Sequence, residues 1–325
     1  FSSWSRHCTS SLVYNMRCLV TGASGHLGSY LVRLLLNRGH EVVGFVRPQS
    51  DLWRLTDVLP QIRLIRCDLS DVDRAAGEIT SATPQVVFHL AWHGVTGEYR
   101  NDPSQIHCNL TGSLRLLELS QKAGCQCWVG MGSQAEYGPF KGILQEDLPT
   151  RPVTTYGVTK LRVGLLSRQL CESVGTRYVW LRLLATYGPK DDVHHLIPST
   201  TLKLLAGEKP SLTPGEQRWD YLYVEDAAEA LYEVAVNSRV QGVFNLASGE
   251  ARRIREIVES IRDQIDPRLP LGFGEMQYRP DQVMHLQANI SKLQDVTGWR
   301  PRTNFEKGLE KTVEWYRTNR EGRTP

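Results

Sequence analysis

A tyrosine and a lysine four residues apart form the first pair in this chain that could do chemistry together. Tyr156 and Lys160 bound the segment Tyr-Gly-Val-Thr-Lys, and residues four apart share one face of a helix. A lysine ammonium beside a phenol favours the phenolate and so lowers the pKa of the phenol. Tyr156 could then give a proton to a carbinol oxygen, or take one from it, near neutral pH.

A serine upstream of this pair completes a catalytic set. Ser133 follows the apolar run 127–131, which predicts a buried strand. Its hydroxyl could lie beside the phenol and bond the same substrate oxygen, so the three residues indicate acid–base chemistry on an alcohol or ketone over a nicotinamide cofactor. The structural alternative makes Ser133 a turn residue, Tyr156 a half-buried aromatic and Lys160 a solvated charge.

A glycine-rich turn near the start of the chain favours the catalytic interpretation. Residues 21–28 read Thr-Gly-Ala-Ser-Gly-His-Leu-Gly and join a predicted strand, 17–21, to a predicted helix, 27–38. The glycines allow close approach of a pyrophosphate, and the helix N-terminus offers it free N–H groups. A glycine turn without a ligand is the alternative, but this turn opens an α/β pattern, which is the context that supports a dinucleotide site.

The end of the second predicted strand, 42–46, bears on the choice between NAD and NADP. Arg47 follows that strand, and no acidic residue comes before Asp51. An acid there would hold the ribose 2′-OH of NAD, whereas the Arg47 guanidinium could pair with the 2′-phosphate of NADP. We therefore expect NADP(H), with NAD(H) as the alternative cofactor and a solvated arginine as the structural alternative. Asp68, after a third strand, could accept a bond from adenine or cap a helix.

The elements that must position these residues alternate between strand and helix. This alternation predicts a Rossmann-type, doubly wound parallel α/β sheet over residues 16–185. Beyond residue 190 the pattern weakens, so we expect a smaller C-terminal α/β lobe that binds substrate, mainly residues 186–325, with residues 220–247 returning to the first domain. The predicted strands are 17–21, 42–46, 62–67, 86–90, 127–131, 178–184, 221–224 and 243–246, and the predicted helices are 27–38, 110–123, 156–174, 226–237, 254–264 and 305–318.

Composition narrows the class of protein. The chain has 325 residues, is 41% hydrophobic and carries a net charge of +3, so a large core is expected, and neither nucleic acid nor a membrane is expected as a partner. Its seven cysteines include no Cys-x-x-Cys pair, which favours reduced thiols in a cytoplasmic protein without a metal site. Residues 1–15 lack the apolar core of a signal peptide. We interpret them as a disordered tail, a cloning extension or a mis-assigned start before Met16.

The chain resembles the extended short-chain dehydrogenase/reductase family, in its NAD-dependent epimerase/dehydratase group. The resemblance covers residues 16 to about 315 and depends on many motifs in the expected order. They are TGASGHLG (21–28), CDL (67–69), FHLAW (88–92), NLTGS (109–113), GSQAEYG (132–138), YGVTK (156–160), LRLLATYGP (181–189), RWDYLYVEDAA (218–228), FNLASG (244–249), RPD (279–281) and GWRP (298–301).

The resemblance implies a role for particular residues. Ser133, Tyr156 and Lys160 would be catalytic. Together with Arg47, the expected cofactor-binding residues are Gly22, Ser24, Gly25, His26, Leu27, Gly28, Asp68, Leu69, Leu90, Ala91, Trp92, Tyr156 and Lys160. The expected substrate-binding residues are Trp92, Gln134, Thr186, Arg218 and Arg279. The last two would hold the diphosphate of a nucleotide-sugar, since arginine forms charge-assisted, often bidentate bonds to phosphate; the alternative for each is a surface ion pair.

Departures from the family pattern narrow the reaction. Gln134 and Ala135 stand where the 4,6-dehydratases of the family carry an Asp-Glu pair, so loss of water is not expected. Ala185 stands where many members have an asparagine that bonds the diphosphate, and Trp92 would reshape the pocket beside the sugar. We expect loops 92–102 and 190–195 to select the sugar. His194 and His195 would then touch substrate or, alternatively, be solvated.

Three functions follow as hypotheses. The first is an NADPH-dependent 4-ketoreductase of a nucleotide-linked 4-keto-6-deoxy sugar, because NADP(H) is the usual pool for net reduction. The second is a nucleotide-sugar epimerase, in which the cofactor takes hydride and returns it to the other face. The third is a non-catalytic dinucleotide sensor, which has no need of the Ser/Tyr/Lys set. The resemblance also implies a homodimer that pairs helices 110–123 and 156–174.

Overall fold

The computed structural model describes residues 15–95, 97–279 and 282–319. The N-terminal segment expected to be a tail or extension, residues 1–15, lies outside these ranges except for Asn15, as do Pro280 and Asp281 of the late Arg-Pro-Asp motif. Within the described residues no helix has the length and apolar character needed to cross a membrane.

A parallel sheet of seven strands forms the centre of the described structure, in the order β10-β6-β5-β4-β1-β2-β3. Such an order, in which the chain winds outward from β1 in both directions, is the doubly wound arrangement expected from the sequence. The bounds of the strands are β1 (Arg17–Thr21), β2 (Glu41–Val46), β3 (Arg63–Arg66), β4 (Val86–His89), β5 (Cys127–Ser133), β6 (Arg177–Leu183) and β10 (Gly242–Leu246).

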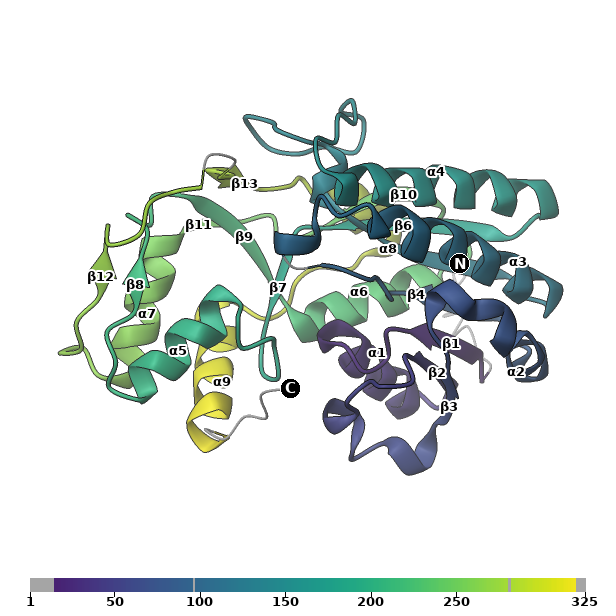
Figure 1. Ribbon diagram of the computed structural model, residues 1–325, viewed down its shortest axis with the longest axis horizontal. Helices are drawn as coiled ribbons and strands as arrows, with labels where there is room; N and C mark the ends of the chain where they lie inside the picture. Colours follow the sequence, from purple (N-terminus) through teal and green to yellow (C-terminus); the bar gives the residue numbers. More distant parts are fainter. Residues whose placement is uncertain (1–14, 96, 280–281, 320–325) are drawn as a thin grey trace, which may run out of the picture.

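Helices cover both faces of this sheet (Figure 1). In β4 the side chains of Val86 and Phe88 enter one apolar cluster and that of Val87 enters the other, because successive strand residues point to opposite faces. Both faces are therefore buried, which explains the nearly continuous apolar strands of the sequence. The first cluster includes residues of α1 (His26–Asn37), α6 (Val224–Val236) and α8 (Ser291–Thr297), and the second includes residues of α2 (Ala76–Ala82), α3 (Gly112–Lys122) and α4 (Thr155–Val174).

A smaller lobe lies beside this sheet and has an apolar cluster of its own (Figure 1). Tyr187, Ile257 and Leu309 are among its buried residues. It contains a four-stranded sheet, in which β9 pairs with β7, β11 and β13, and a short parallel pair of β8 and β12. The bounds are β7 (Ala185–Tyr187), β8 (Ser211–Leu212), β9 (Arg218–Tyr223), β11 (Ala251–Arg253), β12 (Gly272–Phe273), β13 (His285–Leu286), α5 (Leu196–Leu205), α7 (Ile254–Ile265) and α9 (Phe305–Thr318).

The structure contains some elements that the sequence did not predict. The helix predicted over 110–123 is preceded by a π-helical segment, Gln105–Thr111, and such segments are frequent at functional sites. Helices α2, α5 and α8 were not predicted, and α5 contains Pro198 and two threonines that obscure its periodicity. Strands of two or three residues, such as β8 and β11, carry too few positions for a period of two to be recognised.

Candidate active site

The N-terminus of α4 positions the tyrosine–lysine pair. Thr154 caps this helix, with its hydroxyl accepting a hydrogen bond from Gly157 N at 3.1 Å. Tyr156 therefore lies in the first turn and Lys160 one turn later, and both side chains are buried. The backbone N–H of Tyr156 also donates to Arg100 O at 2.8 Å, which ties α4 to the loop that precedes the π-helical segment.

Burial dominates the titration of both residues. It raises the pKa of Tyr156, although a hydrogen bond with the Ser133 hydroxyl and the nearby Arg100 lower it in part. Burial lowers the pKa of Lys160 to about 7, and its Nζ donates to Met131 O at 2.7 Å. The sequence argument, which expected Lys160 to lower the pKa of the phenol, is wrong for this structure: desolvation of the phenolate outweighs Ser133 and Arg100, the two groups that lower this pKa.

Ser133 completes the set at the carboxyl end of β5. Parallel strands bring their carboxyl ends to one edge of a sheet, and ligands of such sheets bind there. Ser133 is buried at that edge, and its hydroxyl lies close enough to the phenol of Tyr156 to lower the pKa of that phenol. The structure thus brings together the three residues that the sequence selected for catalysis.

Trp92 forms an aromatic wall of the site. Lys160 Nζ lies 3.7 Å from the centroid of its ring, and the ring meets that of Tyr156 edge-on at 5.9 Å between centroids. The indole N–H donates to Gln105 Oε1 at 2.8 Å. Gln105 is fully buried in the π-helical segment and also donates to Gly94 O and Tyr99 O. Gln105 therefore fixes both Trp92 and the loop behind it.

The glycine turn has the geometry of a phosphate cradle. Gly22 has a φ of +68°, and a Cβ there would lie 3.0 Å from Ala91 N; a Cβ on Gly28 would overlap Gly22 O. The N-cap of α1 is Gly25, which supplies no side-chain cap among the described residues, so the first N–H groups of the helix can bind an anion. The backbone at Ser24, Gly25, His26 and Leu27 therefore fits the pyrophosphate of a dinucleotide.

A buried chain of hydroxyls and imidazole holds Leu90 and Ala91 against this turn. Thr21 Oγ1 accepts hydrogen bonds from Leu90 N at 3.1 Å and from Ala91 N at 3.0 Å. Its own proton must then go to His89 Nδ1, 3.0 Å away, which leaves His89 Nε2 as the donor to Ser113 Oγ at 2.8 Å. Full burial lowers the pKa of His89 to about 3, so the imidazole stays neutral.

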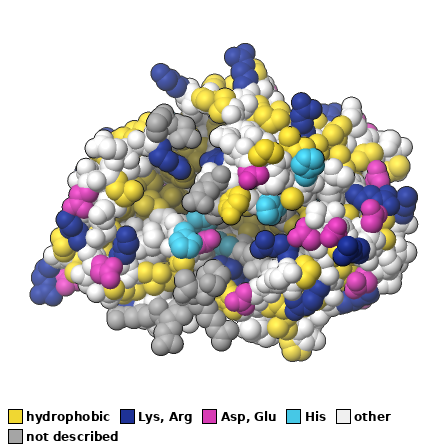
Figure 2. Space-filling model, in the orientation of Figure 1, with side chains coloured by type: hydrophobic (Ala, Val, Ile, Leu, Met, Phe, Trp, Pro, Cys, Tyr) yellow, Lys and Arg dark blue, Asp and Glu magenta, His cyan; other side chains and the backbone are white. Residues whose placement is uncertain are grey.

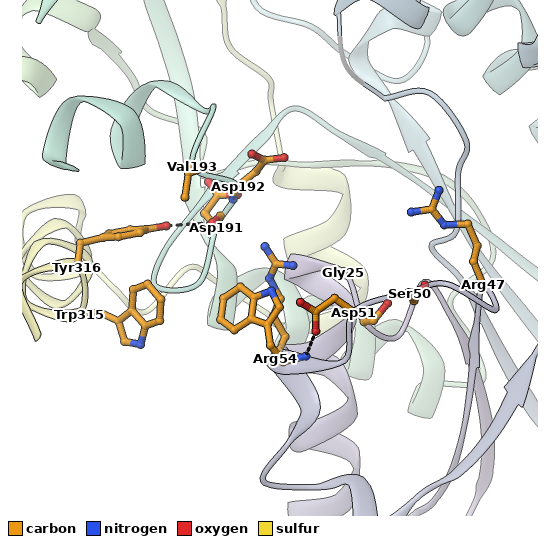
Figure 3. Close-up of a pocket in the computed structure, with 12 residues that line it drawn as sticks. Gly25, Arg47, Ser50, Asp51, Arg54, Asp191, Asp192, Val193, Trp315 and Tyr316 are labelled. Carbon is orange, nitrogen blue, oxygen red and sulfur yellow. Dashed lines mark hydrogen bonds between the residues drawn. The ribbon is translucent and has the colours of Figure 1, made fainter. Parts of the chain in front are cut away.

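A cavity of about 230 Å³ opens between the glycine turn and the end of β2. Its lining includes Ser24, Gly25, Arg47 and Ser50, together with the carboxylates of Asp51, Asp191 and Asp192 and the aromatic side chains of Trp53, Trp315 and Tyr316. Figure 3 shows the Arg47 side chain extending from the end of β2 apart from Asp51. The Asp51 carboxylate accepts a hydrogen bond from Trp53 N at 2.9 Å. An exposed guanidinium is thus the charged group directly after β2.

The side chain of His26 spans the two lobes rather than facing a phosphate. Its Nδ1 lies 3.2 Å from Asp191 Oδ1, and its Nε2 lies 3.1 Å from Pro189 O. His195 pairs with the same carboxylate at 3.0 Å, and this pairing raises the pKa of His195. His26 can therefore serve a cofactor only through its backbone, while Asp191 links the glycine turn to the loop after β7.

A profile of the NAD dependent epimerase/dehydratase family matches residues 18–247. The chain belongs to this family. A dTDP-glucose 4,6-dehydratase of Neisseria gonorrhoeae is 28% identical over 340 aligned residues, with 93% of this chain and 96% of that protein covered.

Solved structures of the epimerase/dehydratase family match the whole fold. A UDP-N-acetylglucosamine 4-epimerase of Methanobrevibacter ruminantium M1, in complex with UDP-N-acetylmuramic acid, superposes with a TM-score of 0.85 at 27% identity, covering 94% of this chain and 99% of that one. A UDP-glucose 4-epimerase of Thermus thermophilus, in complex with NAD, gives 0.84 at 27% identity, covering 94% and 100%. The resemblance, the fold class and the assignment as an enzyme are confirmed.

The remaining residues selected from the sequence lie on different elements of the fold. Asp68 caps the turn that begins at Leu69, accepting from Ser70 N at 3.0 Å, so the capping alternative describes its present contacts. Gln134 directly follows Ser133 in a 3₁₀ turn, and Thr186 lies in the middle of β7.

The two arginines expected at a diphosphate lie on adjoining segments of the smaller lobe. Arg218 begins β9, is exposed and forms no ion pair with the described residues. Arg279 reaches the other side: its Nη1 is 3.6 Å from the position of a Cβ on Gly97, in the loop that Gln105 supports. Figure 2 shows one face of the molecule, which is hollowed near its centre and has histidine side chains around the hollow.

Sequence reasoning missed several residues that hold this site. Gln105 and Asp191 gave no local signal, because each acts on residues far away in the chain. Glu136 did give one: an acidic residue two positions before a glycine, in a turn directly after a buried strand. Its side chain is almost completely buried, which a solvated turn residue would not be.

Proposed function

We propose that this enzyme is a nicotinamide-dependent oxidoreductase of nucleotide-diphosphate sugars, and that its net reaction is the NADPH-dependent reduction of a 4-keto-6-deoxy sugar. The observation that carries this proposal is the buried meeting of Ser133, Tyr156 and Lys160 at the edge of the sheet where the glycine turn opens. A pure binding module has no need of a protonated phenol beside a hydroxyl and a cation.

The chain's own groups would handle the proton. Because burial raises the pKa of Tyr156, its phenol remains protonated at neutral pH and can donate to a substrate carbonyl oxygen. The Ser133 hydroxyl would bond the same oxygen, and the Lys160 ammonium would stabilise the charge left on the phenolate. The bound dinucleotide would supply the hydride.

Arg47 supports NADP(H) over NAD(H). It lines the cavity at the end of β2 together with Ser24, Ser50 and Asp51, and a guanidinium and hydroxyls suit a 2′-phosphate. The preference for net reduction depends on this residue, since NADP(H) is the usual pool for reduction.

The substrate class follows from the relatives and from two cations. The relatives named above act on dTDP- and UDP-linked sugars according to their names, and Arg218 and Arg279 would hold such a diphosphate through charge-assisted bonds. We propose that residues 186–325 chiefly bind this part of the substrate. Gln134 and Ala135 offer no acid or base for loss of water, and both carboxylate oxygens of Glu136 are engaged by hydrogen bonds within the protein.

Epimerisation is the second candidate, favoured by the two 4-epimerase structures that share this fold. The Ser/Tyr/Lys set serves both reactions equally. The difference lies in whether the cofactor leaves after each turnover.

The decisive experiment measures cofactor content and turnover together. A reductase is expected to purify largely free of dinucleotide and to consume NADPH when a dTDP- or UDP-linked 4-keto-6-deoxyhexose is added. An epimerase would release tightly bound NAD(H) on denaturation and interconvert C4 epimers without added cofactor. Dinucleotide binding with no turnover of any sugar nucleotide would contradict both proposals and leave the sensor.

A further inference from the structure

The carboxylate of Glu136 lies directly behind the Ser133 backbone. Ser133 Oγ accepts from Ala135 N at 3.2 Å, and Glu136 Oε1 accepts from Ser133 N at 2.9 Å. This reciprocal pair closes the 3₁₀ turn at the end of β5. The direction of the Ser133 hydroxyl is thereby tied to the Glu136 carboxylate.

Two residues of β6 hold that carboxylate in place. Trp180 Nε1 donates to Glu136 Oε1 at 3.0 Å, and Arg182 Nε donates to Oε2 at 2.8 Å. Glu136 is 1% exposed and Arg182 6%. A Cβ on Gly132 would overlap both the carboxylate and the indole, so this stretch of β5 is shaped to admit the pair.

The arrangement continues to the neighbouring strand. The Arg182 guanidinium lies 4.5 Å from the centroid of the Tyr137 ring, and Tyr137 OH donates to Asn245 Oδ1 at 2.6 Å. Asn245 belongs to β10, which pairs with β6 in register through this residue and Arg182. Three adjacent strands thus clamp one turn, the turn that carries Ser133.

An ion pair removed this far from water is a costly way to stabilise a turn. The free energy lost when two charges leave water is roughly as large as the free energy gained from their attraction. Apolar residues of similar volume often stabilise a fold to the same extent. Stability alone therefore does not account for Glu136, whereas a fixed position for a reacting hydroxyl does.

We propose that Glu136 is a positioning residue of the active site, whose Arg182-bound carboxylate fixes the Ser133 hydroxyl against the Tyr156 phenol. This inference depends on the proposed function, since it assumes that Ser133 and Tyr156 share a substrate oxygen. Glu136 acts through Ser133 and needs no contact with substrate.

The charge of Glu136 also reaches the titrating groups. It raises the pKa of Tyr156 and that of Lys160, so removing it lowers both. The other charged or titratable groups facing this pair are Arg100 from the loop and His89 from β4, and Arg182 lies behind them as the partner of Glu136. These three remain when Glu136 is neutralised. The unpaired Arg182 cation then acts in the same direction, because a nearby positive charge favours a phenolate and disfavours an ammonium.

Two substitutions separate the geometric and the electrostatic contributions. Glu136→Asp keeps the charge but is too short to reach Ser133 N and Arg182 together. We expect kcat to fall about 10- to 100-fold, with KM for the sugar nucleotide nearly unchanged and the pH profile in place. Glu136→Gln should lower kcat similarly and also move the alkaline limb of the kcat profile to lower pH, because the proposed reduction needs a protonated Tyr156 and a charged Lys160 and Glu136 raises the pKa of both.

Asp226→Asn is the matched control. Asp226 is a buried carboxylate in the first turn of α6, bonded to Thr303 N at 2.9 Å, away from the Ser/Tyr/Lys set. It should leave kcat and the pH limb as in the wild type. A wild-type kcat in Glu136→Asp would overturn the proposal. This variant keeps the proposal testable even if Glu136→Gln does not fold because Arg182 has lost its charged partner.

A measurement that does not depend on catalytic turnover can test the role of Glu136 independently of the proposed function. The ultraviolet absorbance of the Tyr156 phenolate can be isolated by difference during a pH titration. The spectrum of Tyr156→Phe is subtracted from that of the wild type, and the spectrum of Glu136→Gln/Tyr156→Phe is subtracted from that of Glu136→Gln. The phenolate should form at lower pH in the Glu136→Gln background. If the wild type turns over no sugar nucleotide, the proposed function fails while this titration still tests Glu136; identical titrations would contradict its influence on the phenol.

Discussion

Burial penalises the charged form of every titratable group in the site, and this affects Tyr156 and Lys160 differently. The phenol is kept protonated because its pKa is raised, and the ammonium is brought near its midpoint at neutral pH because its pKa is lowered to about 7. Tyr156 is thus prepared to act as an acid, in keeping with reduction. Lys160 keeps its proton more readily when Glu136 is ionised.

Replacing the phenol tests the acid directly. Tyr156→Phe should lower kcat about 10²- to 10⁴-fold, the usual contribution of a positioned acid, while dinucleotide binding changes little. Stopped assays of sugar-nucleotide turnover and fluorescence titration with NADPH measure the two quantities. Turnover within a few-fold of the wild type would exclude Tyr156 as the proton donor.

Replacing the arginine after β2 tests the cofactor preference. Arg47→Gln removes the exposed guanidinium from the cavity at the end of β2, so Kd for NADPH should rise about 10- to 100-fold, the usual contribution of a hydrogen bond to a charged group. Kd for NADH should stay nearly constant. Equal effects on both cofactors, measured by calorimetry, would show that Arg47 does not read the 2′-phosphate.

Adjacent strand ends hold the cofactor side of the site as one unit. Thr21 ends β1, His89 ends β4 and Ser113 lies in the first turn of α3, and their hydrogen bonds join all three elements. The neutral imidazole is required, since a second ring proton would oppose the hydroxyl proton of Thr21. Protonation of one side chain therefore disturbs a strand-to-strand contact.

This unit should make stability depend on pH. The folded-state pKa of His89 lies below its ordinary value of 6.5, at about 3, so its contribution is fully present above pH 6.5 and is lost as pH falls toward 3. Between pH 6.5 and about pH 5 the free energy of unfolding should drop by about 2 kcal/mol from this residue. Urea unfolding at both values should show that drop in the wild type and a smaller one in His89→Gln; equal drops would refute the linkage.

The whole molecule places its site between the Rossmann-type sheet and the smaller lobe. His26 and His195 bind Asp191 from the two sides, and Arg279 lies against Gly97 across from its own lobe. Loops 92–102 and 190–195 were both expected to select the sugar. Loop 92–102 thus contacts the smaller lobe through Gly97 and Arg279, and loop 190–195 contacts the Rossmann-type domain through Asp191 and His26. The side chain of His194 is exposed.

We also propose that the molecule is a homodimer formed by α3 and α4. Three large apolar side chains are exposed on these helices: Leu165 (55%) and Leu166 (37%) on α4, and Ile106 (45%) just before α3. A symmetric dimer would bury the set from each of its two subunits. Leu165→Glu should yield monomers in light scattering, whereas Val153→Glu, on an exposed residue before α4, should not. Monomers in the wild type would contradict the proposal.

Local patterns in the sequence were enough to predict most of the large sheet and to select Ser133, Tyr156 and Lys160, which the structure brings together. Apolar runs, helical spacing and the glycine turn each depend on residues close together in the chain, and so does the Tyr156–Lys160 spacing. The order of the motifs then indicated the family. These features can be recognised in the sequence because backbone geometry repeats every two residues in a strand and every 3.6 residues in a helix.

Tertiary structure alone decided how the site is held and charged. Glu136 meets Arg182, Gln105 meets Trp92, and Asp191 meets His26, across 46, 13 and 165 positions of sequence. It also reversed the expected pKa of Tyr156, because desolvation depends on everything packed around a group and not on its neighbours in the chain. Contacts between distant segments and the exclusion of water are properties of packing, and no local pattern records them.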